Sequence, residues 1–561
     1  MRAHRYTIPL AALLATLPLL ISPTCGHDLL FHLTSWLEAA THFRHLLWPI
    51  WADTPAYNAG EPRFLFYPPI SWTLGGLLGL LLPWPVIPGA FTWIALTLSG
   101  FSAHKLASRY APPAPALLAA ILYLANPYML FTAYERTAYG ELLAAAILPL
   151  LFLAAFANRP KITAIAVPIG LLWLTNAPAA IMGCYALAFL TVIRLVHVPG
   201  KQDSSRNHFT LTTLAATALG LTLAAAYLLP AVMERPFIQS DMALVEGMRI
   251  ADNTLFHRMP GPTPDSLYHD QVVRTASTIA LLLLAAIAAA YAAKRRTLSS
   301  PTHHPDSLPP STIPACLLLT AFIAILLTTW SAPLWTHIPE LRFLQFPWRL
   351  MALLTPILTI LAARALPTTP NRWLTPASLT LAAVLITPAW FVFHQPCEQK
   401  DTIASRVALF HSTLGTEPTD EYTPVTADGD SLYPNNPPFW LVLSSTASAK
   451  KDEAINDPPP TGRMPAGAPN YLQITPQNPV FLVLNRRQFP LWSITVNGKP
   501  SPPHTPIRDD GLIVLDLPAG PNTIEIRQLP LRSQAWGLLL TLLATAILLL
   551  LHRRLRQQST P

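Results

Sequence analysis

Three short segments of this sequence place ionisable side chains beside an apolar stretch. In the first, residues 24–63, Asp28 directly follows such a stretch, and Glu61, Arg63 and Tyr67 stand where the next one begins. Charged groups at these boundaries are costly unless they are paired or used, so they are candidates for a functional site. The Asp28 carboxylate can accept a proton, but an Asp before an apolar periodic stretch can equally cap a helix. The residues alone leave both interpretations open.

The second segment places Glu135, Arg136 and Glu141 between two apolar stretches. One continuous helix would put these two glutamates on different faces, so we expect a turn or a helix start between them. Glu135 and Glu141 are candidates for acid–base chemistry and Arg136 for binding an anion. The simpler alternative is that Arg136 only pairs with Glu135 at the membrane interface.

The third segment carries Arg342, Gln345 and Arg349 at the start of another apolar stretch. The planar guanidinium group binds phosphate through two parallel hydrogen bonds, so two arginines here suit a phosphate-bearing ligand. Snorkelling of the two side chains toward lipid headgroups is the alternative.

Four histidines, His27, His32, His42 and His45, share the first segment. Asp28 and His32 are spaced i,i+4, so one helix face can hold both, and a metal site there is conceivable. Histidines on an amphipathic helix in the interface are the more ordinary explanation. The sequence has no HExxH, Walker A, GxSxG or paired CxxC motif, which gives no support to soluble protease or nucleotide-driven chemistry.

The elements that hold these residues are predicted to be membrane helices. Of 561 residues, 12% are charged and 52% are hydrophobic, whereas soluble proteins average roughly 25% charged residues. Together with the mean hydropathy of +0.37, the recurring apolar runs indicate a polytopic, mainly α-helical membrane protein. These runs lie near residues 8–21, 64–82, 86–104, 114–131, 138–157, 162–176, 178–194, 209–231, 274–293, 312–330, 347–366, 373–392 and 534–551.

The basic residues set the expected orientation. The net charge of +8 comes from residues in short loops and near the two ends of the chain, as in cytoplasmic loops, and no basic stripe interleaves with aromatics, which argues against nucleic-acid binding. Both termini then lie inside, so the number of spans is even. We expect about twelve full spans, with one segment of 64–131 entering and leaving on one side or lying in the interface. Residues 29–37 form an amphipathic stretch that we also expect to lie in the interface.

The polar stretch 393–533 is predicted to be a small extracytoplasmic β-domain. Strand-like runs at 480–484, 492–496, 511–515 and 522–526 are separated by turn chemistry, which predicts antiparallel strands. A Pro/Asp-rich loop is expected at 415–470.

The sequence thus divides into three parts. Residues 1–392 form the transmembrane domain with its outer loop 24–63, residues 393–533 the β-domain, and residues 534–561 the last transmembrane helix and a basic tail. Cys25 and Cys397 both adjoin spans on the outer face, where a disulfide between them remains an open alternative.

The sequence closely resembles a group of bacterial multi-pass membrane proteins labelled 6-pyruvoyl-tetrahydropterin synthase-related. The strings that carry this resemblance are GHDLLFHLTSWLEAA, GEPRFLFYPPISW, LRFLQFPWRL and FPLWSITVNGKP…GLIVLDLPAGPNTIEI. The label implies no pterin chemistry, because the soluble synthase has a His-based zinc site with no counterpart here. An acidic residue directly after the first span, a second acidic cluster and a C-terminal outer domain are similar to the GT-C superfamily of membrane glycosyltransferases.

That resemblance implies transfer of a sugar on the outer face, from a polyprenyl-phosphate sugar donor to a lipid, glycan or protein acceptor of the cell envelope. Asp28 aligns with the residue that acts as general base in working members. Glu141 or Glu135 matches the second acidic motif, so Asp28 and Glu141 are the expected ligands of a divalent metal, Mg or Mn. His27–Asp28 stands where many members carry two acidic residues, a departure that bears on metal dependence and catalysis. The implied substrate-binding residues are His27, His32, Glu61, Arg63, Tyr67, Arg136, Arg342, Gln345 and Arg349.

Two other functions stay open: a lipid-linked glycan transporter, and a non-catalytic scaffold of envelope assembly. A transporter needs ionisable residues deep within its spans, and the apolar stretches hold very few, which favours the enzyme over the transporter. The expected location is the bacterial inner membrane, with the active face toward the periplasm.

Overall fold

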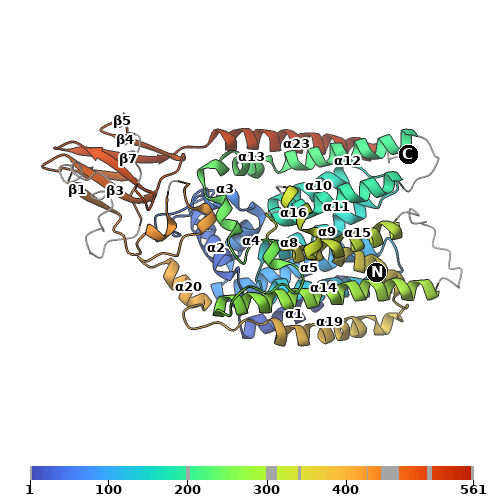
Figure 1. Ribbon diagram of the computed structural model, residues 1–561. Helices are drawn as coiled ribbons and strands as arrows, with labels where there is room; N and C mark the ends of the chain where they lie inside the picture. The colour runs from blue at the N-terminus through green and yellow to red at the C-terminus, as the bar shows by residue number, and fades with distance from the viewer. Residues whose placement is uncertain are drawn as a thin grey trace.

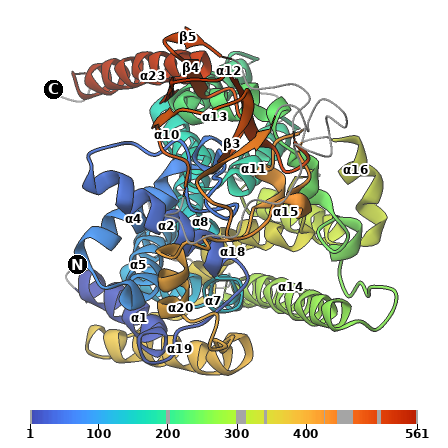
Figure 2. The ribbon, with the colours of Figure 1, turned by 90° about the vertical axis from the view of Figure 1, so that its left-hand side faces the viewer.

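A long helical body carries a β-sandwich at one end, and both chain termini stand toward the other end (Figure 1). The computed structural model describes residues 3–196, 203–297, 312–338, 341, 343–425, 427–443, 467–501 and 508–557. Arg342, one of the predicted phosphate-binding residues, lies outside the described residues. Seen from the sandwich end, α14 and α19 lie on one side of the helical body and α23 on the opposite side (Figure 2).

Helices make up most of the described chain, as the composition predicts. The α-helices of the first half are α1 (Ala3–Ile21), α2 (Leu29–Arg44), α3 (Arg63–Phe66), α4 (Pro69–Leu81), α5 (Ile87–Ala107), α6 (Pro113–Leu124), α7 (Pro127–Tyr134), α8 (Tyr139–Ala144), α9 (Leu148–Ala155), α10 (Ile162–Thr175), α11 (Ala177–Val196), α12 (Asp203–Leu223) and α13 (Ala225–Met233). Those of the second half are α14 (Pro264–Thr297), α15 (Thr312–Leu326), α16 (Ala332–His337), α18 (Met351–Ala365), α19 (Asn371–Phe393), α20 (Ile403–Phe410) and α23 (Arg532–Gln557).

Every apolar stretch predicted from the sequence is helical, but the helices differ in length. Within the described residues, seven are long and apolar enough to cross a membrane, and two bent pairs raise this number to nine if each pair is one span. The pairs are α12 with α13, bent by 75°, and α15 with the helical turns at 329–337, bent by 92°. Four shorter apolar helices lie at Arg5–Ile21, Pro69–Leu81, Tyr139–Ala155 and Ile162–Thr175. The total of about twelve full spans therefore stays a prediction.

Helix α2 lies inside the protein, where the sequence suggested a helix in the membrane interface. Leu33, Trp36 and Leu37 are all buried, and α2 packs along α4. A side chain at Gly75 of α4 would place its Cβ 2.2 Å from the Trp36 ring, so glycine permits this close approach. The apolar side of α2 is thus covered by protein, which corrects the expected interfacial placement.

The C-terminal domain is a sandwich of two antiparallel sheets. One sheet has the order β1-β3-β6 and the other β2-β7-β4-β5, and they share an apolar core. The strands are β1 (Phe439–Leu443), β2 (Tyr471–Ile474), β3 (Val480–Arg487), β4 (Trp492–Val496), β5 (Lys499–Pro500), β6 (Leu512–Leu517) and β7 (Asn522–Gln528). The four predicted strands are confirmed, and β1 adds a strand within the expected loop 415–470. Asn497 and Gly498 both have positive φ in the turn between β4 and β5, as a two-residue hairpin requires.

The first outer loop packs against the sandwich. Strand β3 is buried along its whole length, because the second sheet covers one of its faces and the loop residues Ala56 and Ala59 pack with Leu432 on the other. Such double coverage explains why β3 begins as a continuous apolar run instead of an alternating one.

The beginning of the same loop is fastened by a covalent bond. Cys25 and Cys397 form a disulfide, which answers the question that the sequence left open. Next to it, Thr24 and Pro396 form an antiparallel β-bridge. The start of the loop is therefore tied to the segment that leads from α19 into the C-terminal domain.

Candidate functional site

A break between α7 and α8 creates the turn on which the candidate site is built. Helix α7 ends at Tyr134 and α8 begins at Tyr139. Glu135 and Arg136 therefore lie in the turn, and Glu141 lies in the first turn of α8. The change of direction that the sequence predicted between the two glutamates is confirmed.

Backbone hydrogen bonds hold the start of α2 against this turn. The Asp28 N–H donates to the Arg136 carbonyl at 2.9 Å, and the His27 N–H donates to the Glu135 carbonyl at 3.3 Å. A Cβ at Gly26 would stand 2.2 Å from the Glu135 carbonyl oxygen, so only glycine allows this contact. Although Asp28 occupies the N-cap position of α2, its side chain makes no capping hydrogen bond. The Asp28 carboxylate therefore does not cap the helix.

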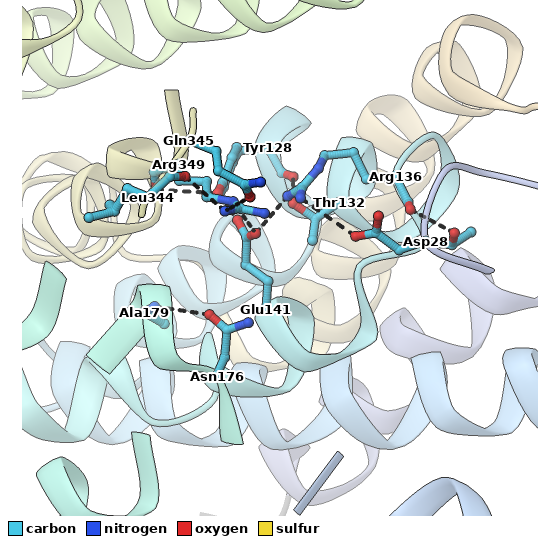
Figure 3. Close-up of polar contacts among 11 residues, drawn as sticks. Asp28, Tyr128, Thr132, Arg136, Glu141, Asn176, Ala179, Leu344, Gln345 and Arg349 are labelled. Carbon is cyan, nitrogen blue, oxygen red and sulfur yellow. Dashed lines mark hydrogen bonds and ion pairs between the residues drawn. The ribbon is translucent and has the colours of Figure 1, made fainter. Parts of the chain in front are cut away.

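Arg136 connects two carboxylates that are far apart in the sequence (Figure 3). Its Nη1 donates to Glu141 Oε2 at 2.6 Å, and its Nη2 lies 3.7 Å from Asp28 Oδ2. Arg136 thus pairs with Glu141 and Asp28, where the sequence offered Glu135 as the simpler partner. Burial lowers the pKa of the Arg136 guanidinium, but Glu141 and Asp28 more than reverse this, so the net pKa is raised and the group stays charged.

Arg349 approaches the same carboxylate from a third segment of the chain. Its Nε lies 3.5 Å from Glu141 Oε2, and its Nη1 donates to the Leu344 carbonyl at 2.8 Å and to Gln345 Oε1 at 3.3 Å. The Tyr128 hydroxyl donates to the other oxygen of Glu141. Both oxygens of Glu141 therefore already have partners within the protein. Gln345 helps to hold Arg349 in place.

Two stacked aromatic rings cover one side of the arginine pair. The ring centroids of Phe346 and Trp348 lie 4.9 Å apart. The Arg136 guanidinium lies 4.7 Å from the Trp348 centroid, and that of Arg349 lies 4.8 Å from the Phe346 centroid. Such cation–π contacts fix the planes of both guanidinium groups and shield them from water.

Asp28 is the accessible member of this cluster. Its side chain is 40% exposed, whereas Arg136 is 3% and Glu141 4% exposed. A ligand from outside therefore meets the Asp28 carboxylate first, with two buried guanidinium groups behind it. Arg349 Nε faces Glu141 Oε2 at 3.5 Å without a hydrogen bond in the described chain, so its ion pair is looser than that of Arg136.

His27 and Glu135 flank Asp28. His27 Nε2 shares a hydrogen bond with the Tyr268 hydroxyl of α14. Burial lowers the pKa of His27, and burial raises the pKa of Glu135 to about 8. At neutral pH, His27 is therefore uncharged and Glu135 largely protonated, so neither adds a strong charge beside the arginines.

His32 and Tyr67 form an aromatic wall near the same cluster. Their ring centroids lie 5.7 Å apart, and His32 also packs against Tyr139 at 5.3 Å. Burial lowers the pKa of His32 to about 4, and burial together with the charge of Asp28 raises the pKa of Tyr67. Both side chains are neutral, so they shape the site and do not supply charge.

Glu61 and Arg63 form a separate buried ion pair. Arg63 Nε donates to Glu61 Oε1 at 2.7 Å, and its Nη1 and Nη2 donate to Ser35 Oγ at 3.1 Å and Thr419 Oγ1 at 2.9 Å. The Thr419 N–H donates to Glu61 Oε2 at 3.0 Å. These contacts tie the first loop to the segment after α20, so they give Glu61 and Arg63 a structural role, and the substrate-binding role of both stays a prediction.

A divalent metal fits this arrangement poorly. Metal ligands must offer free carboxylate oxygens, but Tyr128 and the arginines occupy both oxygens of Glu141. Arg136 occupies the space between Asp28 and Glu141 where the sequence suggested a metal. Among the described residues, no group of three or more His, Cys, Asp or Glu side chains is placed to hold a metal ion.

Sequence reasoning missed two residues of this cluster. Tyr128 lies inside an apolar run, where nothing distinguishes it from a packing residue. Asn126, two residues earlier, did give a signal. An Asn before a Pro is a helix-start pattern, so it indicated that a new helix begins inside this apolar run. Trp348 lies in the string LRFLQFPWRL, where nothing local shows that its ring lies against Arg136.

The helical fold and this cluster define a membrane protein with a polar site at one end of its helices. A protein-family model described as "6-pyruvoyl-tetrahydropterin synthase related domain; membrane protein" matches residues 64–395. The match covers more than half of the chain, so the chain belongs to this family. The matched range contains Arg136, Glu141 and Arg349 but neither Asp28 nor the β-sandwich. No curated protein matches the chain.

Two solved structures show partial similarity. The arabinofuranosyltransferase AftD from Mycobacteria has 19% sequence identity and a TM-score of 0.38, over 70% of this chain and 27% of that protein. The oligosaccharyltransferase of Archaeoglobus fulgidus in the apo form has 15% identity and a TM-score of 0.42, over 83% of this chain and 65% of that protein. The chain thus spans less than two thirds of either protein, and these likenesses decide nothing about its activity.

Proposed function

We propose that the chain is a membrane glycosyltransferase that moves a sugar from a polyprenyl-phosphate donor to an acceptor of the cell envelope, on the outer face of the membrane. The observation that carries this proposal is the exposed Asp28 carboxylate in front of the buried guanidinium groups of Arg136 and Arg349. A base and an anion site are the two groups that such a transfer needs. The resemblance of the first outer loop to the GT-C superfamily points the same way.

In the proposed step, an acceptor hydroxyl oxygen attacks the anomeric carbon of the donor sugar. The bond from that carbon to the phosphate oxygen breaks, and polyprenyl phosphate leaves with the electron pair. The acceptor proton passes to the Asp28 carboxylate. Proton transfer to a positioned base typically contributes about 10²–10⁴-fold to the rate.

Arg136 and Arg349 suit the leaving group because it gains negative charge as the bond breaks. Charged donors fixed in advance stabilise such developing charge without reorganising during the reaction. Glu141, Tyr128 and the aromatic rings hold the two arginines in place. The contact of 3.7 Å between Arg136 Nη2 and Asp28 is longer than a charge-assisted hydrogen bond, so this donor can turn to a phosphate oxygen.

The test uses the purified full chain in lipid nanodiscs with a panel of polyprenyl-phosphate sugars as donors and a mixture of envelope lipids and glycans as acceptors, and follows donor loss and free polyprenyl phosphate. We expect the wild-type chain to turn over at least one donor and Asp28→Asn to lose about 10²-fold or more. The thermal midpoint of this variant should be unchanged, because the amide keeps the shape of the carboxylate. Asp265→Asn, an exposed position on the first turn of α14, is the matched control and should keep full activity.

Equal turnover by wild type and Asp28→Asn would overturn the assignment of the base. Tight donor binding without turnover by the wild-type chain would replace the enzyme with a carrier or scaffold that binds the lipid-linked sugar. A chain that neither binds nor turns over any donor of the panel would reject the proposal for these substrates.

A further inference from the structure

A pocket of about 570 Å³ opens between the first outer loop and the β-sandwich. Asp53 and Asn58 line it from the loop, and Phe439, Ala468, Asn470 and Arg486 line it from the sandwich. Its volume lies in the range of small-molecule sites. None of the residues of the Asp28 cluster lines this pocket, so it is a second place where a ligand can bind.

The loop side of the pocket has an unusual backbone. Ala56, Tyr57 and Asn58 have φ values of 56°, 50° and 66°, a left-handed conformation that residues with side chains rarely adopt. The Tyr57 N–H donates to the Thr416 carbonyl at 2.9 Å, and the Ala59 N–H closes the turn onto the Ala56 carbonyl at 2.8 Å. Strain of this kind persists only where surrounding structure imposes it, and it is common at ligand sites.

The sandwich side is also irregular at this place. The pairing of β3 with β6 changes register between Leu484 and Arg487, so Asn485 and Arg486 lie in a bulge. Bulges commonly redirect a side chain toward a functional site. Asn485 Nδ2 donates to the Tyr57 carbonyl at 3.2 Å, which joins the bulge directly to the left-handed turn.

Arg486 is held rigidly at the wall of the pocket. Its Nη1 donates to Asn470 Oδ1 at 2.9 Å and its Nη2 to the Ala468 carbonyl at 2.7 Å. Its guanidinium lies 4.5 Å from the ring centroid of Trp492. Asp53 is exposed within the same pocket and accepts no hydrogen bond from the described residues.

We propose that this pocket binds a neutral carbohydrate unit. Each sugar hydroxyl both donates and accepts. Asn58 Nδ2 already donates to the Thr413 carbonyl at 2.9 Å, and Arg486 binds Asn470 Oδ1 and the Ala468 carbonyl. The pocket therefore offers the Asp53 carboxylate and the Asn58 amide oxygen as acceptors and the Asn470 amide nitrogen as a donor. Phe439 and Ala468 offer apolar surface to the C–H faces of a sugar ring. A strongly charged ligand is disfavoured, because an anion would face Asp53 and a cation would face Arg486.

The pocket is connected to the Asp28 cluster through α2. The Thr54 N–H, next to Asp53, donates to Glu38 Oε1 at 2.6 Å, and α2 runs from Asp28 to Glu38 and beyond. At the helical rise per residue, these two positions are about 15 Å apart along the axis. We therefore assign the pocket to a sugar unit of the acceptor glycan remote from the reacting hydroxyl. Only this last step rests on the proposed function; saccharide binding itself does not.

The test titrates the full chain in nanodiscs with neutral pentose and hexose oligosaccharides by calorimetry, and with a sulfated and an aminated oligosaccharide for comparison. We expect neutral oligosaccharides to bind and Asp53→Asn to weaken the binding about tenfold or more, as for loss of a charged acceptor. Asn58→Gly should weaken it about fivefold, since glycine keeps the left-handed backbone and removes the amide. Asp430→Asn and Asn435→Gly are the matched controls, since Asp430 is exposed and Asn435 is a left-handed asparagine outside the pocket.

Absence of neutral oligosaccharide binding, equal affinity of all variants, or a preference for the sulfated or aminated probe would each overturn the proposal. Asp28→Asn separates it from the glycosyltransferase assignment, because this variant should bind oligosaccharides as the wild type does. Binding without any sugar transfer would reject the proposed enzyme and leave the pocket standing. Transfer with the same acceptor KM in the wild type and both pocket variants would reject the acceptor role of the pocket.

Discussion

At the scale of single residues, the cluster places one guanidinium between two carboxylates that come from different segments. Arg136 reaches Glu141 with one nitrogen and Asp28 with another, and its plane rests over Trp348. A lysine ammonium is a point charge, so it has neither the separate N–H donors of a guanidinium nor its planar face. The geometry therefore requires arginine in particular, and not only a positive charge.

Arg136→Lys should lower sugar transfer at least about tenfold and raise the KM for the donor, because the loss of one charged hydrogen bond is worth about 1.5–3 kcal/mol. Steady-state kinetics with varied donor concentration measures both effects. Arg406→Lys is the control, since Arg406 of α20 pairs with Asp401, just before that helix and outside the cluster. An unchanged KM for the donor in Arg136→Lys would mean that this arginine does not hold the phosphate.

The same geometry predicts how transfer responds to metal removal. Arg136 supplies positive charge where Asp28 and Glu141 would have held a metal ion. We expect EDTA to leave the rate of transfer within about twofold, because no step here draws on a bound cation. The opposite result would be a loss of activity in EDTA that Mg or Mn restores. It would show that Arg136 moves away from Asp28 and Glu141 and that these two carboxylates bind the metal expected from the sequence.

At the scale of elements, α2 carries a buried acid between the two sites. Glu38 accepts the Thr54 N–H at 2.6 Å, and burial together with Asp53 raises the pKa of Glu38 from 4.5 to about 8. At a pH between these two values, Glu38 is protonated in the folded chain and ionised in the unfolded chain. Rising pH therefore favours unfolding across this window, and the contribution of Glu38 to stability is complete only below it.

Glu38→Gln should flatten this dependence and raise the thermal midpoint by several degrees at the alkaline end of the window. The amide keeps the oxygen that accepts the Thr54 N–H and carries no charge to bury. Thermal unfolding of the chain in nanodiscs at several pH values measures the effect, and a weaker slope of the same sign should remain from Glu135, whose pKa is also raised to about 8. Glu417→Gln, at an exposed position, should behave as the wild type. If the thermal midpoints of Glu417→Gln and Glu38→Gln changed with pH in the same way, the argument would be refuted.

Elements were the level at which the sequence predicted most. Apolar run length located the helices, and Asn497–Gly498 located a hairpin, since both signals are local. The site was harder, because Tyr128 meets Glu141 only through the turn between α7 and α8 and Trp348 meets Arg136 only through the packing of distant segments. Burial likewise depends on what covers a face, so the sequence of α2 could show an apolar side but not that α4 would cover it.

At the scale of the whole molecule, the first outer loop joins the helical body to the sandwich. The Cys25–Cys397 disulfide fixes its start, and Ala56 and Ala59 pack against β3 near its end. Asp28 therefore lies at the end of the body that carries the sandwich. Arg553 and Arg554 lie in the last turns of α23, which ends at Gln557 toward the opposite end of the body (Figure 1). The charge bias of membrane proteins predicts the cytoplasm on that side.

Labelling with a membrane-impermeant maleimide tests this arrangement in intact cells. Asp430→Cys in the sandwich domain should be labelled at once, and Gln557→Cys at the end of α23 only after the membrane is opened, because the proposed orientation puts the two positions on opposite sides of the bilayer. Wild-type chain, whose free cysteines in the described part are Cys184 and the buried Cys316, gives the background. The reverse pattern would put Asp28 in the cytoplasm and remove the basis for an outer-face sugar donor. Immediate labelling of both positions would instead mean that α23, the candidate span between them in the described chain, does not cross the membrane.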